Sequence, residues 1–397
     1  MSAATGVVTS QATSHGAPAS AGDAVASDAR PLRIAQVVPA MDTGGMEVMV
    51  LGLSVALRRH GHDARIICTE SLGGMADRVR DSGVPLELVP AQGLSSLVAP
   101  GALTARFRSG RMDVVHSHSG VCAKASRAAH AARVPAILHT RHGIQLPFSR
   151  SDRFFLWLGA VQTDVTAGCS VDVVKYYRQM LPRRDGIVLV ENGIDDAALH
   201  RVRPGDGALR DELGVPHDAL VMGTVARLHA VKNQQLMIRA LAELDDRWHL
   251  VLVGDGALRE ALAAQAAAAG LTGRVHFAGQ RAISAALYAS FDVFVLSSLS
   301  EAMPMTVLEA FASRVPVVAS AVGGLPAVLD GGRLGRLFPG GDATALAAAV
   351  RETVRDADGT AAQVERAALR LAERHTVEAM TLAYESLYRG CLAAARR

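Results

Sequence analysis

Two glutamates lie eight positions apart in the stretch from Phe291 to Gly324, near the start of a predicted helix. An apolar run, Phe291 to Leu296, is typical of a buried parallel strand. Glu301 lies in the polar turn after it, and Glu309 lies inside the helix that Pro304 begins. The free N–H groups of a helix's first turn bind phosphate, whereas carboxylates suit sugar or ribose hydroxyls. The stretch therefore predicts a nucleotide-sugar pocket. The alternative is an amphipathic helix with two solvated glutamates.

Two cations follow another predicted strand, Leu220–Val225. Arg227 and Lys232 stand just ahead of a helix, where a diphosphate would need them; the alternative is an exposed surface pair. Gly44 and Gly45 follow the first predicted strand and would let a phosphate or sugar approach the backbone closely. A plain tight turn explains the two glycines almost equally well.

Histidines also follow strands in the first half of the chain. His118 and His142 could each donate to a sugar hydroxyl or stabilise charge, although single histidines are usually structural. We expect His116 and His139 to point into the packing of the sheet. Asp255, between two glycines, is expected to shape a turn.

The sequence lacks the common signatures of other nucleotide and metal sites. Gly254-Asp255-Gly256 has no third glycine of a dinucleotide fingerprint, and no Walker phosphate loop is present. Asp356-Ala357-Asp358 has metal-carboxylate spacing but is interpreted as a helix end, so neither a metal nor another cofactor is predicted. The scattered cysteines, Cys68, Cys122, Cys169 and Cys391, indicate reduced thiols in a cytosolic protein.

Composition narrows the class of protein. Of 397 residues, 50% are hydrophobic and 20% charged, and the net charge of +3 is too small to argue for nucleic acid. The longest apolar candidate, Phe154 to Val161, is too short to span a membrane. Residues 31–195 carry more basic than acidic side chains, which could face anionic lipid or a phosphorylated acceptor; a solvated surface explains them more simply. We expect a cytoplasmic protein, with peripheral contact to the inner face of the membrane as an option.

Strands and helices alternate through most of the chain, which predicts an α/β fold with parallel sheets covered by helices. The predicted strands are Arg33–Val38, Ala64–Cys68, Leu86–Val89, Asp113–His116, Ala136–Thr140, Asp164–Ala167, Ile187–Val190, Leu220–Val225, His249–Val253, Arg274–Phe277, Phe291–Leu296 and Val315–Ala319. The alternation breaks near Glu191 to Asp195, and a polar passage follows. This predicts a disordered tail (residues 1–30), a doubly wound domain (31–195) and a second one (196–376). Because ligands bind beyond the carboxyl ends of parallel strands, the polar residues above are expected to line one central cleft.

These residues resemble glycosyltransferase family 4, a family of retaining enzymes with the GT-B fold. The matching segments are GGMEVMVLGLSVALRRHGHDARIICT (from Gly44), HTRHG (from His139), ENGID (from Glu191), GTVARLHAVKNQQLMIRAL (from Gly223), LVLVGDG (from Leu250), EAMPMTVLEAFASRVPVVAS (from Glu301) and GRLFPGGD (from Gly335). They span nearly everything after the tail. The glutamate pair is specific in this setting, whereas the glycine pair alone is weak.

The resemblance implies roles for the residues around the donor. Arg227 and Lys232 would hold the diphosphate, Glu309 the ribose hydroxyls, and Glu301 hydroxyls of the donor sugar. Backbone N–H groups near Met305 and Thr306 would aid the sugar and phosphate. Gln280 and Arg281 lie where the family places the base.

On the other side of the cleft, the resemblance places His142 near the reacting sugar and Gly45 near the phosphates. Gly44 and His118 are weaker candidates for the acceptor side. Catalysis would rest on His142, Glu301, Arg227 and Lys232. The last helix, about 377–395, would pack back on the first domain. Family members often have glycine and an aromatic residue where this chain has Ala302-Met303-Pro304-Met305, so the identity of the donor sugar stays open.

The implied activity is hexosyl transfer, without a metal, from a nucleotide diphosphate sugar to a saccharide or lipid-linked acceptor. The GGME opening resembles bacterial exopolysaccharide-associated members, which suggests cell-surface polysaccharide synthesis. Two alternatives remain at this point. A nucleotide-sugar epimerase of the same fold would consume donor without an acceptor, and a non-catalytic nucleotide- or sugar-binding protein would not consume it at all.

Overall fold

The computed structural model describes residues 30–91, 93, 96, 100–143, 150–181, 186–196, 199 and 208–397. Nearly all of the predicted disordered tail lies outside these residues. So does most of the polar passage after Asp195 that was expected to join the two domains. Everything from Leu32 onward forms one compact unit.

The first sheet has seven parallel strands in the order β3-β2-β1-β4-β5-β6-β7. Its strands are β1 (Arg33–Val38), β2 (Asp63–Cys68), β3 (Leu86–Leu88), β4 (Val114–His118), β5 (Ala136–Arg141), β6 (Val165–Gly168) and β7 (Ile187–Leu189). Both faces of the central strands are buried, as in β4, where all five residues are inaccessible. This explains why these strands appear in the sequence as continuous apolar runs rather than alternating ones.

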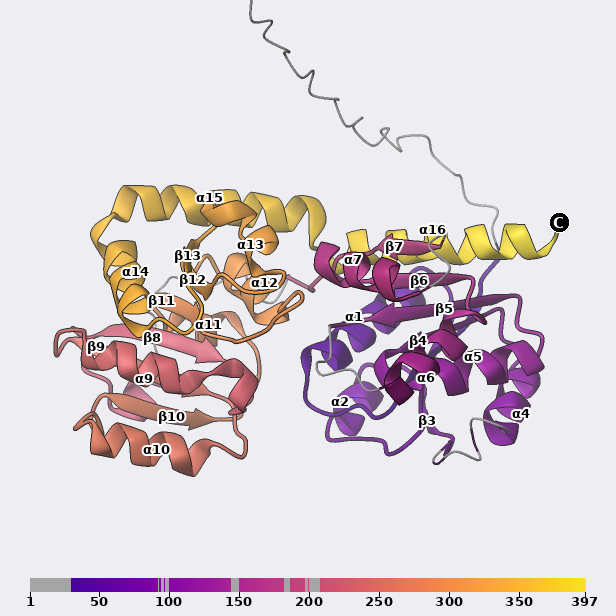
Figure 1. Cartoon of the computed structure of the whole chain (residues 1–397), viewed down its shortest axis with the longest axis horizontal. Helices are drawn as coiled ribbons and strands as arrows, with labels where there is room; N and C mark the ends of the chain where they lie inside the picture. Colours follow the sequence, from indigo (N-terminus) through magenta and orange to yellow (C-terminus); the bar gives the residue numbers. More distant parts are fainter. Residues whose placement is uncertain are drawn as a thin grey trace, which may run out of the picture. The chain divides into compact units, whose positions relative to one another are not determined.

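Helices cover both faces of this sheet (Figure 1). They are α1 (Gly45–Arg59), α2 (Ala76–Asp81), α4 (Gly101–Ser109), α5 (Cys122–Ala131), α6 (Arg150–Ala160) and α7 (Val171–Met180). Helix α1 buries Met49, Val50, Leu53 and Leu57, which recur at helical spacing along one stripe. Among the described residues, no helix combines the length and the apolarity needed to cross a bilayer.

The second sheet repeats the plan with six parallel strands in the order β10-β9-β8-β11-β12-β13. Its strands are β8 (Leu220–Val225), β9 (Trp248–Val253), β10 (Val275–Gly279), β11 (Val293–Leu296), β12 (Val317–Ser320) and β13 (Arg336–Phe338). The associated helices are α8 (Ala208–Leu213), α9 (Gln234–Ala242), α10 (Arg259–Ala268), α11 (Ala285–Ala289), α12 (Met305–Ala312), α13 (Leu325–Val328), α14 (Ala343–Arg355) and α15 (Ala357–Arg374). Two Rossmann-like parallel sheets, as predicted, are therefore confirmed.

Several local features differ from the sequence prediction. Strand β13 and helix α15 were not predicted. Asp356, interpreted as a helix end, lies between α14 and α15, and its side chain accepts a hydrogen bond from the N–H of Gly359 to begin α15. Pro304 is the residue before α12, with extended ψ of 125°, and Met305 is the first helical residue. Aspartate is a favoured residue at the start of a helix, so Asp356 both follows α14 and caps α15. The start of α12 differs from the prediction by one residue.

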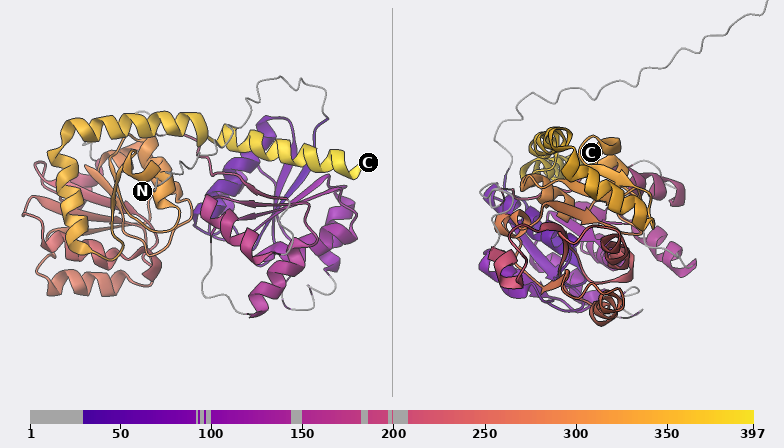
Figure 2. Two further views of the ribbon diagram at one scale, coloured as in Figure 1. Left: turned by 45° about the horizontal axis from the view of Figure 1, so that its top comes forward. Right: turned by 90° about the vertical axis from the view of Figure 1, so that its left-hand side faces the viewer.

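The C-terminal helix α16 (Val377–Ala395) packs against α1 and β5 of the first sheet. It is the yellow ribbon of Figure 2. The segment before it pairs with Ile194: the Ile194 N–H donates to the His375 carbonyl at 2.9 Å, and the Val377 N–H donates to the Ile194 carbonyl at 2.8 Å. Glu385 of α16 accepts from His60 and His62, each at 2.9 Å. Tyr384 and Tyr388 of the same helix are fully buried.

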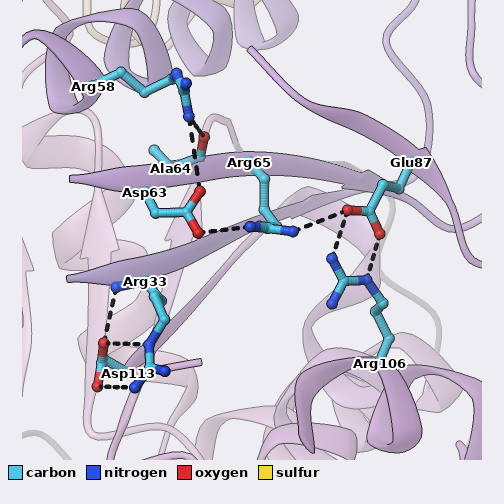
Figure 3. Close-up of polar contacts among 8 residues, drawn as sticks. All are labelled: Arg33, Arg58, Asp63, Ala64, Arg65, Glu87, Arg106 and Asp113. Carbon is cyan, nitrogen blue, oxygen red and sulfur yellow. Dashed lines mark hydrogen bonds and ion pairs between the residues drawn. The ribbon is translucent and has the colours of Figure 1, made fainter. Parts of the chain in front are cut away.

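Ion pairs link strands and helices of the first sheet (Figure 3). Arg65 of β2 contacts Asp63 at 2.6 Å and Glu87 of β3 at 3.2 Å. Glu87 also receives Arg106 of α4, whose Nη2 lies 2.6 Å from Oε1. The guanidinium of Arg106 holds the pKa of Glu87 below its usual range. These side chains are partly exposed, so each pair contributes little to stability.

Candidate active site at the carboxyl ends of the two sheets

Each sheet reverses its winding direction beside its first strand. In the first sheet β4 lies next to β1, and in the second β11 lies next to β8. The loops after such neighbouring strands diverge, and the crevice between them is where open α/β sheets bind ligands. The chain places Gly44 and Gly45 after β1 and His118 at the end of β4. It places Arg227 and Lys232 after β8 and Glu301 after β11.

Lys232 and Glu301 meet at the second switch point. Lys232 Nζ donates to Glu301 Oε1 at 2.6 Å, and Ser298 Oγ donates to the same oxygen at 2.6 Å. Their side chains are 22% and 10% exposed, so the pair is partly shielded from water. Both bonds end on Oε1, which leaves Oε2 uninvolved in them. The sequence predicted both residues for this site, and the structure brings them into direct contact.

The loop that carries Arg227 is shaped by the Gly254–Gly256 turn. The Leu228 N–H donates to the Asp255 carbonyl at 2.9 Å. Gly254 has φ of +125°, and a Cβ there would lie 2.1 Å from the Ala226 carbonyl oxygen. Only glycine tolerates both the conformation and the approach. Asp255 therefore shapes a turn, as predicted, with its side chain accepting from the Gly256 N–H at 2.8 Å. The turn supports Arg227, which is exposed.

Glycine is also required behind Glu301. Gly323 has φ of +51°, and a Cβ on it would lie 2.0 Å from the Glu301 carbonyl oxygen. The neighbouring Gly324 N–H donates to that same oxygen at 2.9 Å. The Glu301 backbone is thus fixed by the loop after β12, so its side chain leaves a defined point.

Helix α12 presents its first turn beside these loops. Pro304 has no side chain that can cap it, so the first N–H groups, at Met305 and Thr306, are not capped by that residue. Inside the helix, Glu309 is 6% exposed and accepts from Tyr288 Oη at 2.5 Å through Oε2. Burial raises the pKa of Glu309, and the hydrogen bond from Tyr288 opposes this rise.

Gln280 and Arg281 lie directly after β10, and both are exposed. The Arg281 side chain is not free: its Nη1 contacts Glu212 Oε2 at 3.1 Å, and its Nε donates to the Ala278 carbonyl at 2.8 Å. The guanidinium is therefore tied back to α8 and β10. That the segment contributes mainly backbone groups to a base stays a prediction.

Histidines gather at the carboxyl end of the first sheet. His118 Nδ1 lies 3.1 Å from His142 Nε2, and the rings are 5.3 Å apart at 31°. Burial lowers the pKa of His142 to about 3, with the nearby charge of Arg141 adding to the effect, and burial also lowers the pKa of His118 well below its usual value. Both imidazoles are therefore neutral near pH 7. His116 and His139, expected in the sheet packing, are fully buried.

Gly44, in an ordinary extended conformation, is the residue before α1, and Gly45 is the first residue of the helix. A Cβ on Gly45 would lie 3.3 Å from Met305 Cγ, so the start of α1 lies beside the start of α12.

Glu47 in the first turn of α1 was not predicted as a site residue. Burial raises its pKa, the charge of Asp42 raises it further, and the charge of Arg227 lowers it. A cavity of about 310 Å³ is lined by residues of α1 and, among others, by Met305 and Glu309.

The sequence analysis did not identify the residues that hydrogen-bond to the predicted site residues and hold them in place. Tyr288 supports Glu309, while Gln36 and Tyr388 support His118. Their only signal is a polar atom in an otherwise apolar strand or helix, which is too common to select them. Within the ranges that the structure describes, no three acidic, histidine or cysteine residues gather in a way that could hold a metal ion. The four cysteines are buried and free.

Family models match two parts of the chain. Residues 43–198 match Glycosyltransferase Family 4, and residues 219–356 match Glycosyl transferases group 1. A D-inositol 3-phosphate glycosyltransferase from Stackebrandtia nassauensis is 30% identical over 392 residues, covering 86% of this chain and 87% of that protein. The putative glycosyltransferase EpsF of Bacillus subtilis is 28% identical over 319 residues, covering 72% of this chain and 79% of its own.

Solved structures share the fold. The Anabaena protein Alr3699/HepE, crystallised with UDP and glucose, superposes with a TM-score of 0.81 at 23% identity, covering 90% of this chain and all of that one. A glycosyltransferase from Rickettsia africae gives a TM-score of 0.81 at 20% identity, covering 92% of this chain and 99% of its own. The predicted family and fold are confirmed. The chain belongs to glycosyltransferase family 4 and is a glycosyltransferase with the GT-B fold.

Proposed function

We propose that the protein transfers a hexosyl group from a nucleotide diphosphate sugar to a hydroxyl of a saccharide or lipid-linked acceptor, with retention at the anomeric carbon and without a metal ion. The observation that carries this proposal is the contact of Lys232 with Glu301 beside the first turn of α12, with Nζ 2.6 Å from Oε1. A cation, a carboxylate that can accept from hydroxyls and the N–H groups at the start of a helix together suit a phosphate joined to a sugar. The UDP and glucose of the HepE crystals make UDP-glucose the first donor to try.

Arg227 and Lys232 would bind the diphosphate of the donor. Phosphate oxygens would compete with Glu301 for the Lys232 ammonium, while Glu301 would keep the Ser298 hydroxyl, 2.6 Å from Oε1. The freed carboxylate would then accept hydrogen bonds from hydroxyls of the donor sugar. The N–H groups of Met305 and Thr306, and that of Gly45, would complete the shell around sugar and phosphate.

The nucleoside would lie toward β10. Glu309 would accept the ribose hydroxyls, a role supported by its buried position and its Tyr288 partner. Gln280 and Arg281 would contact the base chiefly through their backbones, because the Arg281 side chain is bound to Glu212.

In the reaction, the bond from the anomeric carbon to the phosphate oxygen breaks, and a bond to the acceptor oxygen forms on the same face. Arg227, Lys232 and the α12 dipole stabilise the negative charge that builds on the departing diphosphate, as a metal does elsewhere. The acceptor's proton passes to the departing phosphate oxygen. We assign no carboxylate as a covalent nucleophile. Neutral His142 would lie near the reacting sugar and Gly44 toward the acceptor. His118, expected on the acceptor side, is fully buried with both ring nitrogens hydrogen-bonded, so it would act through His142.

The biological setting belongs to the same proposal. The relatives are named as an inositol phosphate glycosyltransferase and as EpsF. These names support a glycosyltransferase, and the GGME opening at Gly44 favours a role in cell-surface polysaccharide synthesis. The basic surface of the first half is compatible with an acceptor held at an anionic membrane.

The test measures thermal stability against UDP, GDP, ADP, dTDP and their sugars in the presence of EDTA. A ligand at 100 times its dissociation constant adds about 2.7 kcal/mol, so a genuine donor is easily seen. We expect one nucleotide series to stabilise the wild type and to fail with Lys232→Ala. Exposed Lys175 provides the control, since Lys175→Ala should behave as the wild type.

Turnover of the selected donor then tests the chemistry. Lys232→Ala should lower kcat by about 10²–10³, the usual cost of removing one charge-stabilising group. NMR of the product should show the anomeric configuration of the donor. An inverted product, or a requirement for a divalent cation, would refute that part of the proposal. Conversion of the donor's sugar without any acceptor would point to an epimerase.

A further inference from the structure

A continuous run of buried hydrogen bonds joins helix α16 to His142. It begins at Tyr384, whose hydroxyl lies 2.9 Å from Thr140 Oγ1, and continues to His116 Nε2 at 2.7 Å. His116 Nδ1 lies 2.8 Å from Tyr388 Oη. Gln36 Nε2 donates to that hydroxyl at 3.3 Å. The remaining links are Gln36 Oε1 to His118 Nε2 at 2.8 Å and His118 Nδ1 to His142 Nε2 at 3.1 Å.

The direction of each bond follows from the Gln36 amide. Its NH₂ group donates to Tyr388, so its carbonyl oxygen must accept, and the donor is the Nε2–H of His118. A neutral imidazole has one N–H, so His118 Nδ1 is a lone pair. It can only accept from His142, which must carry its proton on Nε2. His142 Nδ1 is then a lone pair as well.

That lone pair has no partner among the described residues. His142 Nδ1 is covered by protein and makes no hydrogen bond, although the residue as a whole is only partly buried. A buried acceptor without a donor costs free energy, which a ligand hydroxyl that displaced the atoms covering Nδ1 would recover. The sequence suggested that His142 could donate to a sugar hydroxyl. With Nε2–H engaged by His118, the structure leaves it only as an acceptor.

We infer that Tyr388 of α16, acting through Gln36 and His118, fixes the proton of His142 on Nε2 and so makes His142 a hydrogen-bond acceptor for a sugar hydroxyl. This inference rests on the proposed function for the identity of the ligand, which is a hydroxyl of either the donor sugar or the acceptor. Tyr388, Gln36 and His118 are positioning residues. The C-terminal helix thereby contributes to the site although Tyr388 stands 352 residues from Gln36.

The variant Tyr388→Phe removes the hydroxyl on which the Gln36 amide depends and preserves the buried ring. Tyr384→Phe is the matched control: it also removes a buried hydroxyl from α16, but that hydroxyl contacts Thr140 and not Gln36. We expect kcat/KM to fall about five- to tenfold in Tyr388→Phe, the loss of one net hydrogen bond, and less than twofold in Tyr384→Phe. Equal losses in the two variants would overturn the inference.

The proton on His142 can be read directly, without turnover. In protein labelled with ¹⁵N-histidine, the signal missing from His142→Gln identifies His142, and its two nitrogen shifts report the tautomer. The wild type should carry the proton on Nε2, and Tyr388→Phe should move toward Nδ1–H, whereas Tyr384→Phe should not. An Nδ1–H tautomer in the wild type, the result of a reversed Gln36 amide, would overturn the inference.

Two kinetic arms identify the source of the hydroxyl. If Tyr388→Phe raises the KM for the donor and slows its hydrolysis in water, His142 accepts from the donor sugar. If only the KM for the acceptor rises, the hydroxyl belongs to the acceptor. Because the tautomer is measured on the free protein, it stands even if no nucleotide sugar proves to be a substrate. Failure of the proposed function and failure of this inference are therefore distinguishable.

Discussion

The carboxyl ends of the two sheets share one topology but carry side chains of different charge. In the second sheet, charged groups meet: Lys232 contacts Glu301, and Arg227 stands exposed nearby. In the first sheet, the groups in the same position are neutral imidazoles with lowered pKa values, His118 and His142. A diphosphate requires countercharge, whereas a sugar hydroxyl requires hydrogen-bond partners that do not compete for the diphosphate. Under the proposed function, the second domain would hold the charge of the diphosphate and the first would recognise neutral hydroxyls.

The largest expected effect is a loss of stability of the first sheet, with its buried neutral histidines, as the pH is lowered. Burial lowers the pKa of His116 and His142 to about 3 and places those of His118 and His139 well below the usual 6.5. Below pH 6.5 the histidines bind protons in the unfolded chain but not in the folded one. Their contribution to the free energy of unfolding is therefore fully present above pH 6.5 and is lost as the pH falls toward 3. Each group that stays neutral in the folded state lowers the stability by about 1.4 kcal/mol per pH unit well below 6.5.

The second sheet should lose less stability in the same acid. Burial also lowers the pKa of His249 and His276 there, but these are two histidines against four, and the raised pKa of Glu309 makes its protonation favour the folded state. The chain has two tryptophans, Trp157 in α6 and Trp248 in β9, one for each sheet. In the variant Trp248→Phe the fluorescence of the remaining Trp157 reports on the first sheet, and in Trp157→Phe that of Trp248 reports on the second. Both variants are unfolded with denaturant at pH 7.5, 6.5 and 5.5. We expect the Trp157 transition to move first. His217→Gln, at an exposed position, is the control. Stability of the first sheet that stays level down to pH 5 would contradict the comparison.

Tyr288→Phe tests the charged side with a smaller expected effect. The Tyr288 hydroxyl donates to Glu309 Oε2 at 2.5 Å, and without it the pKa of the buried carboxyl should rise further. A hydrogen bond to a charged group contributes about 1.5–3 kcal/mol, so nucleotide affinity should fall about 10- to 100-fold. Binding should recover partly at higher pH, where the carboxyl ionises. Isothermal titration at pH 6.5 and 8.5 measures both effects.

The control for this prediction is a double-mutant cycle. If Tyr288 acts through the charge of Glu309, then Tyr288→Phe should have almost no further effect on affinity in a Glu309→Gln background. Additive losses in the double variant would show instead that Tyr288 acts on binding independently of Glu309.

Much of this architecture follows from the sequence because its signals are local. Apolar runs such as Leu220–Val225 mark buried strands, and the rule for parallel sheets places Lys232 and Glu301 at one edge without further information. Strand β13 is difficult to detect because it has three residues, only one of which is fully buried. Helix α15 is different: its buried residues Thr360, Ala367 and Leu371 recur at helical spacing, so the signal is present in the sequence although the prediction did not include this helix.

The supporting residues of the site could not be predicted, for a different reason. Gln36 in β1 and Tyr388 in α16 are polar groups in apolar segments, and nothing local distinguishes them from ordinary packing residues. Their function depends on a contact between the two ends of the chain. Tyr288 is similar, since its short helix α11 has no signal that points to Glu309. Sequence patterns thus identify the groups at strand ends but not the groups that orient them.

The smallest expected effect comes from charges that lie away from both switch points. Glu87 receives Arg65 and Arg106 in the network of Figure 3, and Arg106 holds its pKa below the usual 4.5. Because that pKa is depressed, the stabilisation is present above pH 4.5 and is lost as the pH falls through the folded-state value. The side chain is 28% exposed, so Glu87→Gln should cost less than about 1 kcal/mol, and less again in 0.5 M salt. Chemical denaturation at pH 7.5 in low and high salt measures this difference. Sugar transfer should not change, because these charges support the sheet and do not face the ligand. A larger, salt-independent loss would mean that charge in the first domain stabilises as strongly as the neutral histidine network, and the contrast between the two domains would no longer hold.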